Sequence, residues 1–489
     1  MENQLRSCIF LLADGAREDV FKELLMRGML PNILEHIVER GSYTAAVTVF
    51  PSTTGPAYTP FLMGKFPGRC NLPGIRWFDR KRYSEELFSL QRMRSYVGME
   101  SFLMNGDISK EFPTLFELIP HNMSILNELS RGAVGYGNMP KLLSAWHKMR
   151  ANYNHSWSRV DLFGRELLLK SLETRARYTF YVLTGIDHYS HLHHPFHKEV
   201  IGSYLALDET VGEMAKVLKK QGRYDDTLMI ISSDHGLTPT HTHFDSVEFM
   251  KSRGYKTLYY PLVFMHWTDA EAANMISGNS MTHLYVKSSE GWARPTAFDE
   301  LGGLVDALLD RDEVDVVAGV EADGKTTRIK SARGEARAWL ESAGGEGGED
   351  RGRGMNIRYE LINCGDPFGY DGMPRVMSTE DALRLSVETA YPDALLQLIQ
   401  LFESPRSGDL VVSAKEGYDL RVRFESPEHS SSHGALVRDH MMVPLAMSRR
   451  VNREFVRTVD IFPTVLRFLG VSIPNGIDGA CLLDDGDGL

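Results

Sequence analysis

The sequence is poor in cysteine and contains no long apolar run. Its four cysteines, Cys8, Cys70, Cys364 and Cys481, are scattered over 489 residues and form no CxxC pair. This spacing favours reduced, structural thiols over a disulfide framework or a thiolate zinc site. No stretch reaches the ~18 apolar residues that a membrane span needs, and the N-terminal apolar run has no small-residue cleavage site. We therefore expect no transmembrane segment, no signal peptide and a cytoplasmic location.

Positive charge is also in deficit. The chain has 54 Lys and Arg against 65 Asp and Glu, which gives a net charge of −11. This balance argues against binding to a nucleic acid polymer or to acidic lipid. It does not exclude a small anionic substrate, because a bound metal ion can reverse the sign of the charge locally. The length allows two or three domain-sized units, or one large α/β domain with insertions.

Three apolar runs are followed closely by an aspartate. The runs cover residues 8–12, 178–184 and 228–231, and we interpret them as buried strands. The aspartates are Asp14, Asp187 and Asp234. In an open α/β sheet, ligands bind outside the carboxyl ends of the strands, so these carboxylates are candidate metal ligands. Any one of them alone is as readily explained as a turn or helix-cap residue.

Imidazoles accompany two of these carboxylates. His235 follows Asp234 directly, and His191 lies four residues after Asp187. Residues i and i+4 share one face of a helix, so Asp187 and His191 could bind a single ion. Oxygen and nitrogen ligands of this kind suit a zinc-like divalent ion.

A third imidazole is needed for a complete centre. His433 precedes an apolar strand predicted over 441–447, and His429 and His440 compete with it for this role. His241 and His243 follow the Asp234 motif, and we expect them near the rim of the same site.

A hydroxyl-rich elbow follows the strand predicted over 43–50. It reads Pro51-Ser52-Thr53-Thr54 and leads into a short apolar helix that Gly64 closes. A hydroxyl beside free N–H groups at a helix start can bind phosphate or act as a nucleophile. Without metal ligands elsewhere, these residues would be plain helix caps. In the basic and aromatic segment that follows, Arg76 could reach a phosphoryl oxygen.

The remaining sequence suggests insertions in a single domain that spans 1–489. We expect insertions or cap elements over 83–160, where the periodicity is irregular, and over 240–375, where 281–287 and 314–320 are candidate strands. Residues 324–354 are charged and rich in glycine. This composition predicts a flexible surface excursion that contributes no core.

The order of the motifs resembles the alkaline phosphatase superfamily, and most closely its nucleotide pyrophosphatase/phosphodiesterase branch. The matching segments are ADG with Asp14, FPSTT with Thr54, GIDxxxH with Asp187 and His191, ISSDHG with Asp234 and His235, and SHG with His433. They span almost the whole chain in the order of the family. The resemblance implies an α/β fold with a central, mostly parallel sheet flanked by helices and with inserted cap segments.

The resemblance also implies a centre of two divalent metal ions, taken to be zinc. Asp187, His191 and His433 would hold one ion, and Asp14, Asp234 and His235 the other. Thr54 would contact an ion and act as the nucleophile, and Thr53 is the neighbour with which it could be confused. The implied reaction is hydrolysis of a small phosphate ester through a phospho-threonine intermediate.

One departure from the family affects the substrate. Relatives usually place an asparagine after the nucleophile helix, whereas this chain has Ile75 or Arg76 near that place. An arginine would favour a doubly charged monoester, whereas an apolar slot beside it would favour a diester. The sequence leaves both open. Two further alternatives are a metal-dependent phosphomutase and a zinc-binding scaffold without catalysis.

Overall fold

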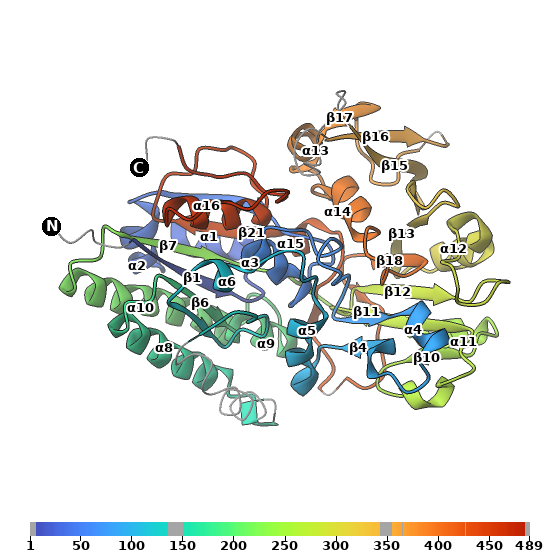
Figure 1. Ribbon diagram of the computed structural model, residues 1–489, viewed down its shortest axis with the longest axis horizontal. Coiled ribbons are helices and arrows are strands. Elements are labelled where there is room, and N and C mark those ends of the chain that lie inside the picture. The colour runs from blue at the N-terminus through green and yellow to red at the C-terminus, as the bar shows by residue number, and fades with distance from the viewer. Residues whose placement is uncertain are drawn as a thin grey trace.

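The computed structural model contains two large β-sheets, one at each end of the molecule (Figure 1). It describes residues 6–134, 150–151, 153–342, 355–363, 365–425 and 427–484. None of the helices in these ranges combines the length and the apolar content that would let it cross a membrane.

A six-stranded sheet forms the core of the first end. Its strands, in spatial order, are β2 (Ser42–Val47), β21 (Met442–Met447), β7 (Thr227–Ser232), β1 (Ser7–Ala13), β6 (Tyr178–Leu183) and β5 (Asn122–Ile125). β1 pairs in parallel with both β6 and β7, and β5 pairs in parallel with β6. Only β21 runs against its neighbours. This mostly parallel sheet confirms the predicted fold class.

Helices cover both faces of this sheet. Those nearest to it are α1 (Glu18–Met26), α2 (Pro31–Ile33), α3 (Thr59–Met63), α8 (Trp157–Glu173), α9 (Gly185–Leu192), α10 (Lys198–Lys220), α15 (Arg438–Met441) and α16 (Ile461–Phe468). α8 and α10 lie together on one side and α16 on the other (Figure 1). Every residue of β1, β6 and β7 is buried, as the uninterrupted apolar runs predicted.

A nine-stranded sheet forms the other end. Its strands, in spatial order, are β10 (Thr257–Tyr259), β11 (Ala272–Ser277), β12 (Met281–Val286), β18 (Leu410–Ala414), β13 (Val314–Val320), β14 (Thr327–Ser331), β15 (Gly334–Ser342), β16 (Met355–Leu361) and β17 (Val376–Ser378). The helices of this end are α4 (Arg80–Glu85), α11 (Ser246–Ser252), α12 (Gly302–Leu309), α13 (Thr379–Ser386) and α14 (Ala394–Leu401). The segment 240–375 therefore builds most of a sheet.

The glycine-rich segment 324–354 contains two of these strands, so the expectation that it contributes no core is wrong for β14 and β15. Ile329, Ala336 and Ala338 are completely buried. In β14 buried residues alternate with half-buried charged ones, which is the pattern of a strand with one face on the core. The prediction rested on the charged, glycine-rich composition of the whole segment, which does not reveal this alternation. Residues 343–354 lie outside the described part of the chain.

The segment 83–160 is also more than a covering element. Its residues 122–125 form β5, the edge strand of the six-stranded sheet, which departs from the expectation of an insertion there. Ahead of β5 lie β4 (Met93–Ser95), α5 (Met104–Asp107) and α6 (Leu115–Leu118), and β4 pairs with β3 (Arg76–Phe78). Residues 135–149 and 152 lie outside the described ranges.

Candidate active site

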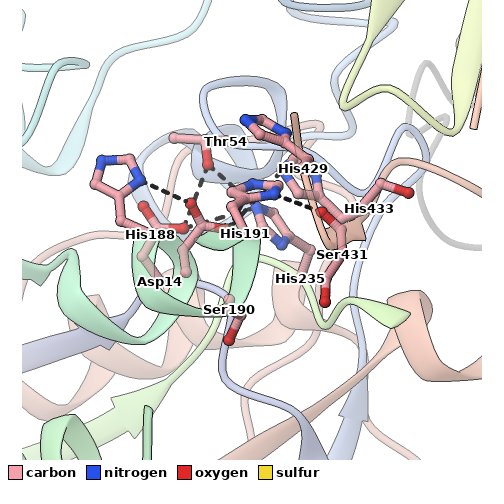
Figure 2. Close-up of polar contacts among 12 residues, drawn as sticks. Asp14, Thr54, His188, Ser190, His191, His235, His429, Ser431 and His433 are labelled. Atoms are coloured by element: carbon pink, nitrogen blue, oxygen red, sulfur yellow. Dashed lines mark hydrogen bonds and ion pairs between the residues drawn. The ribbon is translucent and has the colours of Figure 1, made fainter. Parts of the chain in front are cut away.

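The predicted ligands meet at the carboxyl ends of three parallel strands. Asp14 follows β1, Asp187 lies in the first turn of α9 just after β6, and Asp234 lies two residues beyond β7. β1 pairs with both other strands, so their ends share one edge of the sheet. Figure 2 shows the side chains that gather there.

The first group, called here the Asp187 group, consists of Asp187, His191 and His433. Asp187 Oδ1 lies 3.3 Å from His191 Nε2 and 3.9 Å from His433 Nε2. The i,i+4 spacing on α9 produces the first contact, as predicted. His433 arrives from the segment before β21. The structure thus brings together the three residues expected to hold one ion.

The second group, called the Asp234 group, consists of Asp14, Asp234 and His235. His235 Nε2 lies 3.4 Å from Asp234 Oδ2 and 3.7 Å from Asp14 Oδ1. Asp234 and His235 are completely buried, and Asp14 is 5% exposed. The two groups adjoin, because the rings of His235 and His433 stack with centroids 3.7 Å apart.

Thr54 joins the Asp234 group through its hydroxyl. Its Oγ1 lies 3.1 Å from His235 Nε2 and 3.3 Å from Asp14 Oδ1 (Figure 2). The elbow that presents Thr54 favours glycine next, since Gly55 has a φ of +94°, a backbone conformation that other residues rarely adopt. The neighbouring Thr53 is buried, and its hydroxyl has no hydrogen-bond partner among the described residues.

The chain itself fixes the tautomer of each imidazole. His191 Nδ1 donates to the carbonyl of Ser431 at 2.6 Å, His433 Nδ1 to that of Ser52 at 3.0 Å, and His235 Nδ1 to that of Gly236 at 3.1 Å. A carbonyl only accepts, so Nδ1 carries a proton in each ring and Nε2 is the nitrogen that faces the site. This is the usual support of a metal-binding histidine.

The carboxylates also fit cation ligands. Asp187 Oδ1 and Asp234 Oδ2 are buried and have no hydrogen-bond partner within the described ranges. A buried, unsatisfied carboxylate oxygen is costly unless a cation compensates it. The residues present therefore suit two divalent ions, with three nitrogen or oxygen donors for each.

Burial and neighbouring charges act on the protonation of these groups. Burial raises the pKa of the Asp187 carboxyl, but His191 and other imidazoles outweigh it and hold that pKa well below its usual range. Burial, with the charge of Asp187 adding to it, raises the pKa of Asp234. Burial also holds the pKa of His433 well below its usual range, which keeps this imidazole neutral and able to bind a metal ion.

The competing histidines have other partners. His440 accepts a hydrogen bond at Nδ1 from the Ala435 N–H and contacts the Thr238 hydroxyl through Nε2, so both ring nitrogens are engaged. His429 stacks on His191 with centroids 4.1 Å apart and accepts from the Asn279 amide. Neither belongs to the Asp187 group. His243 lies in a different cluster.

Two site residues had no clear signal in the sequence. The Tyr58 hydroxyl donates to Asp14 Oδ2 at 3.4 Å, and His188 Nδ1 lies 3.2 Å from Asp187 Oδ2. Tyr58 lies in an apolar helical segment with no motif around it. His188 lies in a histidine-rich segment that gives no reason to single it out.

A cavity of about 380 Å³ opens onto both groups. Its lining includes the apolar side chains of Ile75, Tyr96 and Trp157, and the guanidinium groups of Arg76 and Arg421. Arg76 Nη1 donates to the Ile276 carbonyl at 2.8 Å, whereas its Nε has no partner among the described residues. Burial, and then the charge of Arg421, lowers the pKa of Arg76 to about 9.

Comparison with solved structures confirms the fold. Mouse ectonucleotide pyrophosphatase/phosphodiesterase 5 has a TM-score of 0.54 at 12% identity, over 96% of this chain and 97% of that chain. An inactive variant of the mouse protein, in complex with AMP, matches with the same TM-score and identity over 96% of each chain. Phosphonoacetate hydrolase from Sinorhizobium meliloti 1021, in complex with phosphonoformate, has a TM-score of 0.57 at 16% identity, over 95% of this chain and 96% of that chain.

Comparison of the sequence itself gives the family. No curated protein matches the chain. The model of the family described as type I phosphodiesterase / nucleotide pyrophosphatase matches residues 8–300, which is more than half of the chain and includes five of the six ligand candidates. The resemblance found in the motifs is thereby confirmed. The chain belongs to the type I phosphodiesterase / nucleotide pyrophosphatase family and is a phosphoric ester hydrolase.

Proposed function

We propose that the chain hydrolyses small phosphate esters with Thr54 as nucleophile at a centre of two zinc ions. The observation that carries the proposal is the position of the Thr54 hydroxyl, within 3.3 Å of both Asp14 Oδ1 and His235 Nε2 and beside the adjoining Asp187 group. A hydroxyl with only a structural role would not need six candidate ligand side chains around it, five of them buried and His191 partly buried.

Each of the two groups would bind one ion. The Asp187 group would hold one, and the Asp234 group, with Thr54, the other. Two bound divalent cations would stabilise the charge on the attacking and leaving oxygens of an in-line displacement. The absence of cysteine from the donor set suits a catalytic site better than a closed structural one.

The residues of the chain act on the nucleophile and on the substrate. The Thr54 hydroxyl donates to Asp14 Oδ1 and lies beside His235 Nε2, which holds it in place. Because the single lone pair of Nε2 would bind an ion, Asp14 is the group of the chain that would assist loss of the proton. In the first step the bond from Thr54 Oγ1 to phosphorus forms, the ester P–O bond breaks, and the leaving oxygen departs as an alcohol, its proton balanced by the one that Thr54 loses. In the second step water adds to phosphorus and the bond to Oγ1 breaks, which restores the hydroxyl.

The cavity supports a small organic phosphate as substrate. Its volume of about 380 Å³ falls within the range of ligand pockets. Tyr96 and Trp157 offer an aromatic surface, and the Arg76 guanidinium in the lining offers a positive charge for an anionic oxygen. These walls favour a phosphodiester or a nucleotide with an aromatic group, and the solved complex of the mouse protein with AMP is in keeping with this class.

A substrate panel on the purified chain, supplied with zinc, tests the proposal. We expect release of the aryl alcohol from aryl phosphodiesters to exceed that from aryl monoesters, because a diester fills the apolar wall as well. Release of inorganic phosphate from a monoester distinguishes a hydrolase from a phosphomutase. No turnover of either class in the presence of zinc would contradict the proposed function.

A further inference from the structure

Four buried carboxylate oxygens lack a hydrogen-bond partner within the described ranges. Two are the oxygens of Asp187 and Asp234 already described. The other two are Asp419 Oδ2 and Glu425 Oε2, which lie outside the Asp187 and Asp234 groups. The same feature that marks the expected ion ligands therefore recurs at a second place in the molecule.

This second place is a pairing of two short strands. β19 (Tyr418–Asp419) pairs in parallel with β9 (Thr242–His243), and the register sets Asp419 opposite His243. His243 Nδ1 lies 2.9 Å from Asp419 Oδ1. Glu425 follows in the next loop, and one ligand atom from each of the three residues lies within 4.8 Å of the other two. These three residues are called here the Asp419 group.

The chain balances the charge of the group only in part. The side chain of Asp419 is completely buried and that of Glu425 is 3% exposed. The Asn279 amide donates to Glu425 Oε1, which leaves Oε2 unsatisfied. The Arg421 guanidinium acts electrostatically on both carboxylates, but it donates its hydrogen bonds to backbone carbonyls of the same loop. Burial, with Glu425 adding to it, raises the pKa of Asp419 to about 7.

A fourth cluster shows that proximity of such side chains is not enough. His193, His197 and Glu199 also lie within ligand distance of one another. Their side chains are between 27% and 47% exposed, and Glu199 has no buried oxygen without a partner. Water can satisfy these groups, so they need no ion. The Asp419 group differs because its carboxylates are closed off from water.

We propose that His243, Asp419 and Glu425 bind a third divalent cation, separate from the two of the active site. One imidazole and two carboxylates suit zinc or manganese better than magnesium or calcium, which prefer oxygen ligands alone. The proposal goes beyond the proposed function and does not depend on it, because it concerns other side chains and another donor set.

The cation would stabilise the loop that contains Glu425 and His429, beside the active site. Glu425 Oε1 lies 3.2 Å from His429 Nδ1, and His429 stacks on His191 of the Asp187 group. Asn279, which contacts both Glu425 and His429, also forms a backbone bridge with His433. An ion that ties the loop to β9 and β19 would therefore hold His429 against the cavity.

The competing explanation is a protonated His243 without a metal ion. Its Nδ1 lies 2.9 Å from Asp419 and its Nε2 lies 2.9 Å from Glu428. A protonated His243 could therefore form ion pairs with both Asp419 and Glu428. This explanation leaves the unsatisfied oxygens of Asp419 and Glu425 unexplained. If His243 is only protonated, the Asp419 group should bind no zinc.

Counting zinc per chain separates the two explanations. The full-length chain and its Glu425→Ala and His243→Ala variants are incubated with Zn²⁺, freed of excess, and measured by plasma mass spectrometry. We expect each variant to hold one ion fewer than the wild type. His241→Ala, which changes an exposed histidine two residues from His243, should keep the full content. A far-ultraviolet spectrum confirms which variants are folded, and Glu425, in a loop, is the change that least endangers folding.

The decisive quantity is the difference in zinc content between the wild type and each variant, and not the total zinc content. Equal zinc in the wild type and in folded Glu425→Ala would overturn the third site. His433→Ala provides the independent comparison, because it should remove one ion from the active site and leave the Asp419 group filled. Loss of zinc in Glu425→Ala but not in His433→Ala would support the third site while contradicting the proposed active site.

Discussion

Buried carboxylates at two places in the molecule are treated in opposite ways. Beside β18, Asp409 is completely buried, yet it pairs with Arg80 at 2.7 Å and accepts from the N–H groups of Val286 and Thr296. At the edge of the six-stranded sheet, Asp187 and Asp234 each keep one buried oxygen that accepts no hydrogen bond from the described part of the chain. The first arrangement is complete within the chain, whereas the second needs a cation from outside. Buried charge therefore marks a site only where the chain leaves it unsatisfied.

The largest expected effect is on the reaction. Thr54→Ala removes the only hydroxyl that reaches the Asp234 group from the elbow, and we expect a loss of turnover of about 10⁴-fold or more, as is typical of a missing nucleophile. Zinc content should stay the same, since the other ligands remain. Rates on an aryl phosphodiester and plasma mass spectrometry are the measurements.

Thr54→Ser is the matched control for that variant. It keeps a hydroxyl at the same place, so part of the activity should return. Full activity in Thr54→Ala would rule out the covalent route.

The next effect concerns stability at the other end. Asp409→Ala leaves the Arg80 guanidinium buried without its carboxylate, and breaking such a pair costs roughly 3–5 kcal/mol. We expect urea unfolding to show this loss while the zinc content of the folded protein stays unchanged. A fall in zinc content would mean that the two ends are not independent.

A smaller effect depends on pH. His283 is buried, accepts from the Gly408 N–H and donates to the Pro73 carbonyl, and burial lowers its pKa to about 4. Because the unfolded imidazole takes up a proton near its ordinary pKa of 6.5 and the folded one does not, stability present above this pH is lost as the pH falls toward 4. The loss is at most roughly 3 kcal/mol.

The measurement is urea unfolding across this pH range for the wild type and for His283→Gln. The variant should show a flatter dependence of the free energy of unfolding on pH. Identical slopes would assign the acid sensitivity to other buried histidines.

The smallest effect is at an exposed ion pair. Arg294 and Glu300 lie 2.8 Å apart, but their side chains are 37% and 41% exposed. Water screens such pairs, so Glu300→Gln should leave the urea midpoint and the zinc content unchanged. A clear fall in the urea midpoint would show that exposed ion pairs contribute more to the stability of this protein than we expect.

The sequence predicted the parts of the site that follow from local order. The apolar runs before Asp14, Asp187 and Asp234 are buried parallel strands, and the four-residue spacing to His191 places two side chains on one helix face. Strand ends and helix turns are local features, so a linear pattern can reveal them. The choice of His433 over His429 came from a family resemblance and not from local order.

The rest depends on contacts between distant segments. His243 and Asp419 are 176 residues apart, and no spacing links them. Residues 122–125 became an edge strand because β6 offers them a partner, and β14 and β15 pair with each other in a segment whose composition suggested no core. These strands form because they pair with other strands and bury side chains in the core, which their local sequence does not reveal.

Our central proposal is that six carboxylate and imidazole side chains beside Thr54, five buried and one partly buried, are ligands of metal ions. Diffraction from crystals grown with zinc, collected on both sides of the zinc absorption edge, tests it directly. We expect anomalous density at the Asp187 group and at the Asp234 group, with Thr54 Oγ1 next to the latter. Crystals that show no anomalous density at either group, with these side chains well ordered, would contradict it.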